Sequence, residues 1–306
     1  MSALSTSPTR SRRRCPGPLG AVTAVLLLLL GATACGGTAD GSAEPDAPSS
    51  KDGSAASLGV AHVHGLEVDP DDADRVYVAT HDGLFAFTEG AGLDRVGKTR
   101  SDLMGFTVGP ADTLFASGHS APGSGGPADL GLITSTDAGA SWAPVALSGE
   151  ADFHAMDAGE SGVVGYDASN GVLRVSEDGR TFATVAGAPG FIDLAVDTTS
   201  QDVWGTTDRG QLVRSGDGGR SFAEVPDAPQ LVLIDVAPDG TVVGIGMDGR
   251  LHTTTGAGEW TVRDGAADRG LQAFTAGPDG AVWLLDSRGL VRSDDLGDTF
   301  TDAEGW

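Results

Sequence analysis

Histidine is the residue type whose placement in this chain most directly suggests chemistry. His62 and His64 stand two residues apart in "HVHGLEVDP", the stretch 62–70. In an extended strand this spacing puts both imidazole rings on the same side of the backbone. Imidazole nitrogens titrate near neutral pH and bind Zn, Cu or Ni ions. The stretch therefore suggests a transition-metal site, provided that the fold brings further ligands to it.

An internal repeat predicts the fold that would position these histidines. Copies of one short pattern begin 38 to 41 residues apart, a period typical of four-stranded propeller blades. Short alternating strands separated by Gly and Asp turns fill each repeat, and six such units follow one another. The sequence thus predicts an all-β, six-bladed β-propeller over residues 59–306. The copies are "STDAGASW" (135–142), "SEDGRTF" (176–182), "SGDGGRSF" (215–222), "TTTGAGEW" (253–260) and "SDDLGDTF" (293–300).

These strings resemble the Asp-box, or BNR, repeat, whose pattern is S-x-D-x-G-x-[S/T]-[W/F]. Three of the copies match this pattern in full. The resemblance implies that each box joins the third and fourth strands of a blade and is structural. An aspartate can accept backbone N–H groups within such a tight turn. The aspartates assigned to this role are Asp137, Asp178, Asp217 and Asp295.

Alignment of the repeats assigns most of the histidines to one face of the ring. His64, Met104 and His154 occupy equivalent positions at the starts of the innermost strands of the first three blades. The turns that hold His81 and His119 share this face. A Met104 thioether would favour Cu(I). The alternative is that these are separate polar residues of turns and strand starts. The predicted ligands for a Cu or Zn ion are His62, His64, His81, Met104, His119 and His154.

A second resemblance concerns activity. The stretches "HVHGLEVDP", "DLMGF", "ASGH" and "DFHAM" are similar to those of bacterial lipoprotein propellers classed as glycosylhydrolases of the BNR-repeat type. Sialidases of this fold use an arginine triad, but "HVHGL" stands where the first arginine motif would be. Other glycosidases need only paired carboxylates. Under this alternative the candidate catalytic residues are Tyr166, Asp167, Asp152 and Asp193, with Asp208 and Asp286 as further acids.

The N-terminal region predicts export. Four arginines precede an apolar run, Leu19–Leu30, that is too short for a comfortable membrane span, so residues 1–34 are predicted to be a signal peptide. The segment "ATAC" ending at Cys35 resembles a bacterial lipobox, which implies lipidation of Cys35. The alternative is ordinary cleavage and a free secreted product. Residues 35–58 are rich in Gly, Ser and Ala and are expected to form a flexible tether.

Charge and cysteine content limit the remaining functions. Both cysteines lie within residues 1–35, so a disulfide framework or a catalytic thiolate is not expected in the folded region. Without residues 1–34 the chain has 15 basic and 43 acidic residues, a net charge of −28. Nucleic acid is therefore excluded as a partner. We expect a lipid-anchored protein on the outer face of the cytoplasmic membrane or the cell surface. A small molecule, a glycan or a protein remains open as its ligand, and related Asp-box propellers act as assembly scaffolds.

Overall fold

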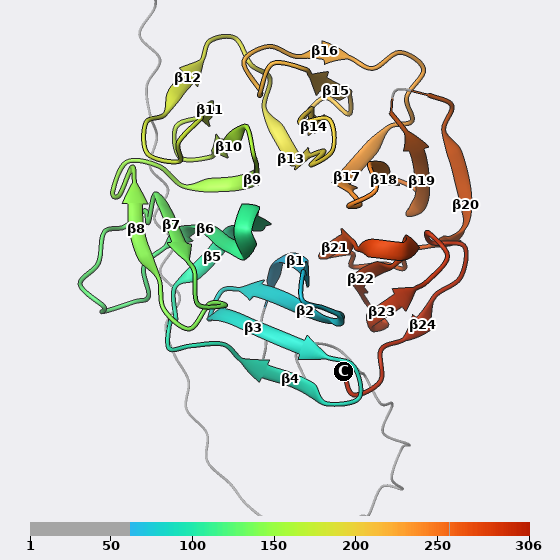
Figure 1. The fold of residues 1–306 in the computed structure, drawn as a ribbon, viewed down its shortest axis with the longest axis horizontal. Helices are drawn as coiled ribbons and strands as arrows, with labels where there is room; N and C mark the ends of the chain where they lie inside the picture. Colours follow the sequence, from blue (N-terminus) through green and yellow to red (C-terminus); the bar gives the residue numbers. More distant parts are fainter. Residues whose placement is uncertain (1–61, 257) are drawn as a thin grey trace, which may run out of the picture. The chain divides into compact units, whose positions relative to one another are not determined.

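The computed structural model describes residues 62–256 and 258–306, which form a ring of six four-stranded antiparallel sheets (Figure 1). In each sheet the strand order follows the chain, and the first strand is innermost. The predicted six-bladed β-propeller is thereby confirmed. The predicted signal peptide, Cys35 and the tether to residue 58 lie outside the described residues.

The first three blades occupy the blue-to-green half of the ring in Figure 1. Blade 1 contains β1 (Val63–Asp69), β2 (Asp72–Thr80), β3 (Gly83–Thr88) and β4 (Gly92–Arg95). Blade 2 contains β5 (Asp102–Gly109), β6 (Thr113–His119), β7 (Leu132–Ser135) and β8 (Ala143–Ala146). Blade 3 contains β9 (Phe153–Gly159), β10 (Gly162–Asp167), β11 (Val172–Ser176) and β12 (Ala183–Val185).

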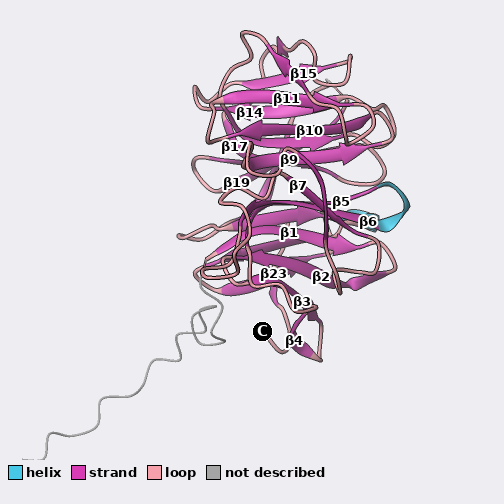
Figure 2. Cartoon of the chain, turned by 90° about the vertical axis from the view of Figure 1, so that its left-hand side faces the viewer, coloured by secondary structure: helices cyan, strands magenta, loops and turns pink. Residues whose placement is uncertain are grey.

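The last three blades complete the ring (Figure 1). The view from the side shows strands of several blades stacked in layers (Figure 2). Blade 4 contains β13 (Phe191–Val196), β14 (Val203–Thr207), β15 (Leu212–Ser215) and β16 (Ala223–Glu224). Blade 5 contains β17 (Leu231–Val236), β18 (Thr241–Gly246), β19 (Arg250–Thr255) and β20 (Thr261–Ala266). Blade 6 contains β21 (Ala273–Ala276), β22 (Val282–Asp286), β23 (Gly289–Ser293) and β24 (Thr301–Asp302).

Helical structure is limited to two single 3₁₀ turns among the described residues, at Pro110–Asp112 and Pro278–Gly280. The first follows β5 directly, the second follows β21 after one residue, and each begins with the proline. The described part of the chain has no helix with the length and apolar character needed to cross a membrane.

The apolar core is divided among the junctions between blades. Six clusters of buried side chains are present, and each joins the facing sheets of two neighbouring blades. Trp204 and Trp283, the largest fully buried side chains, lie in two of these clusters. Because each sheet is covered on both faces, its second strand is buried along most of its length, as in β14 (Val203–Thr207) and β18 (Thr241–Gly246). The ring therefore derives its cohesion from blade-to-blade packing.

The ring closes by packing between blade 6 and blade 1. Every described sheet is made of four strands that are consecutive in the chain, so no strand is shared across the closure. The rings of Phe87 in blade 1 and Trp283 in blade 6 meet edge to face with centroids 6.0 Å apart, and Trp306 packs on the same Phe87 at 5.6 Å. Gly90 N donates to Glu304 O at 2.7 Å. The C-terminal residues thus hold the first blade in place.

The repeated motif forms the turns between third and fourth strands. Asp137 Oδ1 accepts a hydrogen bond from Ser141 N at 2.9 Å, and Oδ2 accepts one from the Ser141 hydroxyl at 2.6 Å. These hydrogen bonds to the charged form lower the pKa of Asp137 to about 2. Asp217 and Asp295 make the same pair of bonds. In the copy at 176–182, which is one residue shorter, Asp178 instead accepts hydrogen bonds from the backbone N–H groups of Arg180 and Thr181. This change adapts the turn to the missing residue.

Buried carboxylates link three successive junctions around the channel. In each case an aspartate of one innermost strand accepts a backbone N–H from the innermost strand of the next blade. Such a bond fixes the spacing between blades at the axis, where little apolar surface is available. The pairs are Asp157 with Val196 N (2.6 Å), Asp193 with Ile234 N (2.9 Å) and Asp235 with Ala276 N (2.7 Å).

The stability of the propeller should fall as pH rises through the neutral range. Burial raises the pKa of Asp157 to about 7 and that of Asp193 to about 8. A carboxyl group with a raised folded-state pKa keeps its proton on folding. The free energy of unfolding should therefore fall between about pH 4 and pH 8, by on the order of a few kcal/mol for the two groups together.

Urea denaturation at several pH values measures this dependence. Asp193→Asn, which removes one titration, should reduce the stability difference between about pH 5 and pH 8. Asp208→Asn changes an exposed aspartate and should leave the difference as in the wild type. An unchanged difference in Asp193→Asn would contradict the assignment.

Candidate functional site

The channel mouth at the starts of the innermost strands is shaped by β-bulges. Five of the six innermost strands have one extra residue opposite the second strand, at equivalent positions near the strand start. A bulge redirects a side chain and is common next to binding sites. The bulged residues are His64, Met104, His154, Ile192 and Val232. The same backbone irregularity thus presents three potential metal ligands on three adjacent blades.

His64, His81 and Asp102 form the first group of potential ligands. His64 Nε2 lies 3.2 Å from His81 Nδ1 and 3.3 Å from Asp102 Oδ1. His81 Nδ1 lies 2.6 Å from Asp102 Oδ2. Tetrahedral zinc with bonds of ~2.0–2.1 Å places neighbouring ligand atoms roughly 3.4 Å apart. The His64–His81 spacing and the spacing from His64 to Asp102 Oδ1 are close to this value, whereas His81 is hydrogen-bonded to the other oxygen of Asp102.

His119, Asp152 and His154 form the second group. Asp152 Oδ2 lies 2.7 Å from His154 Nε2 and 3.4 Å from His119 Nε2. The other ring nitrogen of His119, Nδ1, lies 3.4 Å from Asp129 Oδ1, an arrangement that orients metal-binding imidazoles in many proteins. In each group, the three potential ligand atoms lie within 4.8 Å of one another.

The two groups occupy equivalent places in the repeat. His81 directly follows the second strand of blade 1, and the matching His119 is the last residue of the second strand of blade 2. Asp102 and Asp152 are matching residues two positions before the bulges of blades 2 and 3. Each group therefore spans a junction, with the turn histidine of one blade facing the aspartate of the next. The next three junctions have other residues at these two positions, namely Ala168 and Gly190, Asp208 and Gln230, and Met247 and Gly270.

One carboxylate oxygen in each group lacks a donor. Asp102 Oδ1 and Asp152 Oδ1 are buried and receive no hydrogen bond. The Asp152 side chain is only 3% exposed, so solvent reaches it poorly. A buried acceptor without a donor is energetically costly and calls for an explanation such as an ion or a bound ligand. Both groups therefore have an oxygen that a cation would satisfy.

The histidines of the two groups have opposite pKa shifts. Burial, followed by the nearby charge of His81, lowers the pKa of His64. The hydrogen bond to Asp152 raises the pKa of His154. A metal ligand must be the neutral imidazole. Protons therefore compete with a metal ion at His154 at a higher pH than they do at His64. The charge of His154 also lowers the pKa of His64, which shows that the groups are electrostatically connected.

Met104 and His62 lie beside these groups. Met104 lines a narrow channel cavity of about 90 Å³ together with His64 and His154. The ring of His62 packs edge-on to His81 with centroids 5.3 Å apart, but His62 belongs to neither three-ligand group. His252 on β19 also lies outside both groups.

The four candidate catalytic residues have different environments. The ring of Tyr166 packs against an aromatic side chain of blade 4. Asp167 is fully buried and accepts hydrogen bonds from Arg174 Nε and the backbone of Asn170, which is a structural role. Asp193 lines the channel, with both oxygens bonded to backbone amides. Of the four, Asp152 alone is placed in a cluster of chemically active side chains.

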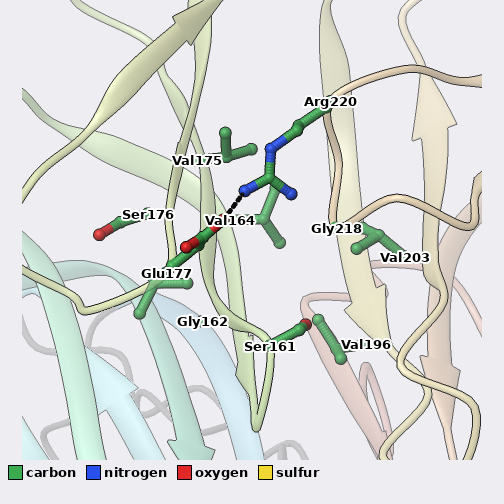
Figure 3. A pocket seen from close by; sticks show the side chains of 11 residues that line it. Ser161, Gly162, Val164, Val175, Ser176, Glu177, Val196, Val203, Gly218 and Arg220 are labelled. Atoms are coloured by element: carbon green, nitrogen blue, oxygen red, sulfur yellow. Dashed lines mark hydrogen bonds and ion pairs between the residues drawn. The ribbon is translucent and has the colours of Figure 1, made fainter.

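A second hollow on the opposite side of blades 3 and 4 does not compete with this site. It lies between β10, β11 and the repeated turn of blade 4, and Arg220 crosses it to form an ion pair with Glu177 (Figure 3). Its volume of about 10 Å³ accommodates one water molecule at most.

Sequence reasoning missed two members of the site, Asp102 and Asp129. Asp102 could have been found, because it matches Asp152 in the repeat and both precede a bulged residue by two positions. Asp129 lies in the long loop after β6, which no repeat position constrains. Its proximity to His119 depends on how that loop folds back.

Comparisons with known proteins support the β-propeller fold alone. Neither the protein-family models nor the curated proteins contain a match to the chain. Among solved structures, virginiamycin B lyase from Staphylococcus aureus with quinupristin has a TM-score of 0.52 and 11% identity, over 79% of this chain and 84% of that one. A GH74 xyloglucanase from Xanthomonas campestris has a TM-score of 0.51 and 19% identity, over 80% of this chain and 46% of that one. YCF48 bound to D1 peptide has a TM-score of 0.50 and 16% identity, over 79% and 81%.

Fold and site together define a class: a β-propeller with histidine and aspartate groups at one mouth of its channel. At these low identities the three structures share the architecture with this chain, and a shared propeller does not transfer activity.

Asp152→Asn should lower the pKa of His154. The charged hydrogen-bond partner raises that pKa in the wild type, so its removal should bring the value to its ordinary 6.5 or below. Titration of the imidazole protons by NMR measures each histidine separately. The pKa of His252, in blade 5, should not change. A His154 pKa that stays raised in Asp152→Asn would contradict the pairing.

Proposed function

We propose that this protein binds transition-metal ions at the channel mouth, one in each His–Asp group. The observation that carries the proposal is the repetition: two adjacent junctions each bring two imidazoles and one carboxylate to within 4.8 Å. The buried aspartate oxygens without donors support it further. A set of separate polar histidines would have no reason to converge on equivalent aspartates.

The ligand types favour a borderline metal. Two nitrogens and one oxygen suit Zn(II), Cu(II) or Ni(II), whereas Ca²⁺ and Mg²⁺ prefer oxygen ligands alone. Met104 adds a soft sulfur donor beside both groups, which would favour Cu(I). Three protein ligands leave one position open on a four-coordinate ion. An ion held in this way is accessible to a small ligand or to exchange.

Purified protein should bind about two Zn(II) or Cu ions, and one ion fewer after loss of either group. His64→Ala should remove the first site and His154→Ala the second, whereas His252→Ala should bind as the wild type does. Titration in competition with a chromophoric chelator gives the number of sites and their affinities. Absence of bound metal, or unchanged stoichiometry in both variants, would overturn the proposal.

Acidification should release the second ion first. Protons compete with the metal for the imidazoles, and the raised pKa of His154 means that this competition begins at a higher pH than at His64. The same titration at about pH 7.5 and about pH 6 should therefore show a larger loss of affinity in His64→Ala, which retains the second site, than in His154→Ala.

We further propose that the propeller is exported and anchored through a lipid on Cys35. The basic N-terminus, the apolar run to Leu30 and the small residues before Cys35 support this. An anchor of this kind would hold the acidic propeller near the membrane through a Gly/Ser-rich tether.

Cys35→Ser should move the protein from the membrane fraction to the soluble exported fraction. Metabolic labelling with a radioactive fatty acid should mark the wild type and leave the variant unlabelled. Cys15→Ser, which changes the cysteine within the predicted signal peptide, serves as the control and should be labelled normally. Labelling that persists in Cys35→Ser would refute the lipid anchor.

A further inference from the structure

At the end of the channel opposite the histidines lies another cavity, which is larger than the 90 Å³ cavity beside Met104. This cavity, here called the vestibule, has a volume of about 640 Å³ and lies where the innermost strands end. Small-molecule sites commonly measure about 300–1,000 Å³. The channel mouth that carries the histidines, by contrast, opens into the smaller cavity of about 90 Å³ at the strand starts. The two cavities share Glu67, Asp157 and Asp235, which therefore form the constriction between them.

The wall of the vestibule is apolar and rigid. Four of the six blades contribute a proline immediately or almost immediately after the innermost strand, and valines of the innermost strands fill the spaces between them. Proline has a fixed backbone dihedral and no N–H group, so this wall is preformed and offers few hydrogen bonds. The prolines are Pro70, Pro110, Pro238 and Pro278.

The ionisable side chains that line the vestibule are all acidic. Its described lining contains no lysine, arginine or histidine. One acid, Asp69, is neutralised by an ion pair with Arg75. The others have no cationic partner: Glu67, Asp71, Asp112, Asp157, Glu160 and Asp235. Burial raises the pKa values of Glu67, Asp157 and Asp235, so a cation is attracted first by the exposed acids Asp71, Asp112 and Glu160. A cation bound beside Glu67 would in turn favour loss of the Glu67 proton.

Glu67 is the acid at the constriction that accepts no backbone N–H group, and its hydrogen-bonding neighbour is the Thr107 side chain. Asp157 accepts bonds from Val196 N and the Thr107 hydroxyl, and Asp235 is held by Ala276 N and Val236 N. Thr107 lies beside Glu67 as well, but its single proton goes to Asp157 at 2.5 Å. Burial raises the pKa of Glu67 well above its usual value, as expected for a carboxyl group that lacks a compensating charge.

We infer that the vestibule binds a small organic cation, an ammonium or guanidinium group on an apolar body, with the charge at Glu67 and the body against the prolines. A bare metal ion fits less well, because the aspartates at the constriction are engaged by backbone amides and a bare ion would leave the wall of prolines and valines uncovered. An anion would face six acids without a base. This site is separate from the histidine groups and does not depend on metal binding.

Three probes of nearly equal shape test the inference. The 2-phenylethylammonium ion carries the positive charge, 2-phenylethanol is neutral and phenylacetate is negative. Calorimetric titration of the full chain near neutral pH should show the ammonium binding at least about tenfold more tightly than the alcohol, with no binding of the carboxylate. Equal affinity for the three probes, or no binding of the ammonium at millimolar concentration, would overturn the inference.

Two substitutions in the vestibule test where the 2-phenylethylammonium ion binds. Glu67→Gln should weaken ammonium binding by about tenfold and leave the alcohol unaffected, whereas Glu259→Gln, an exposed glutamate of blade 5, should change neither. Thr198→Arg places a cation at the exposed rim and should also weaken ammonium binding, so the test does not depend on Glu67→Gln alone. Unchanged ammonium affinity in both vestibule variants would refute the site. His64→Ala should retain ammonium binding, so failure of the metal proposal is recognised separately.

Discussion

Apolar packing between neighbouring blades is the interaction on which the rest of this structure depends. Each four-stranded sheet is covered on both faces by its neighbours, and the six resulting clusters, rather than one central core, contain the buried side chains. Sheets that pack face to face around a ring must converge at their inner edges. The convergence creates a channel whose lining is polar, because the inner strands there contact one another through hydrogen bonds and carboxylates instead of apolar surface.

The two ends of this channel differ in chemistry. At the strand starts, bulges on successive blades turn His64, Met104 and His154 toward a narrow opening, and aspartates of the next blade complete two small groups. At the strand ends, prolines and carboxylates surround a wider cavity without any basic side chain. Glu67, Asp157 and Asp235 lie between the two ends. The same ring therefore offers a nitrogen-rich and an acidic site on one axis, and each is proposed to bind a different class of cation.

The arrangement of the candidate site was predictable only as far as the repeat extends. Matching positions placed His64, Met104 and His154 at strand starts and His81 and His119 in turns, and the structure agrees except that His119 is the last residue of β6. The division into two groups was not predictable, because it depends on which turn histidine faces the aspartate of the next blade. Asp102 follows the repeat and could have been recognised. Asp129 could not, since its loop has no counterpart in the other blades.

The sequence by itself determined the architecture. A period near 40 residues, a recurrent aspartate turn and short apolar strands specify four-stranded blades and their number, since these signals are local and repeated. Only the tertiary structure decided what the channel contains. Closing the ring brings residues of different blades to within hydrogen-bonding distance, and five bulges decide which side chains enter the mouth. Such contacts depend on angles between sheets and on one extra residue per strand, which the alternation of residue types along a single strand does not record.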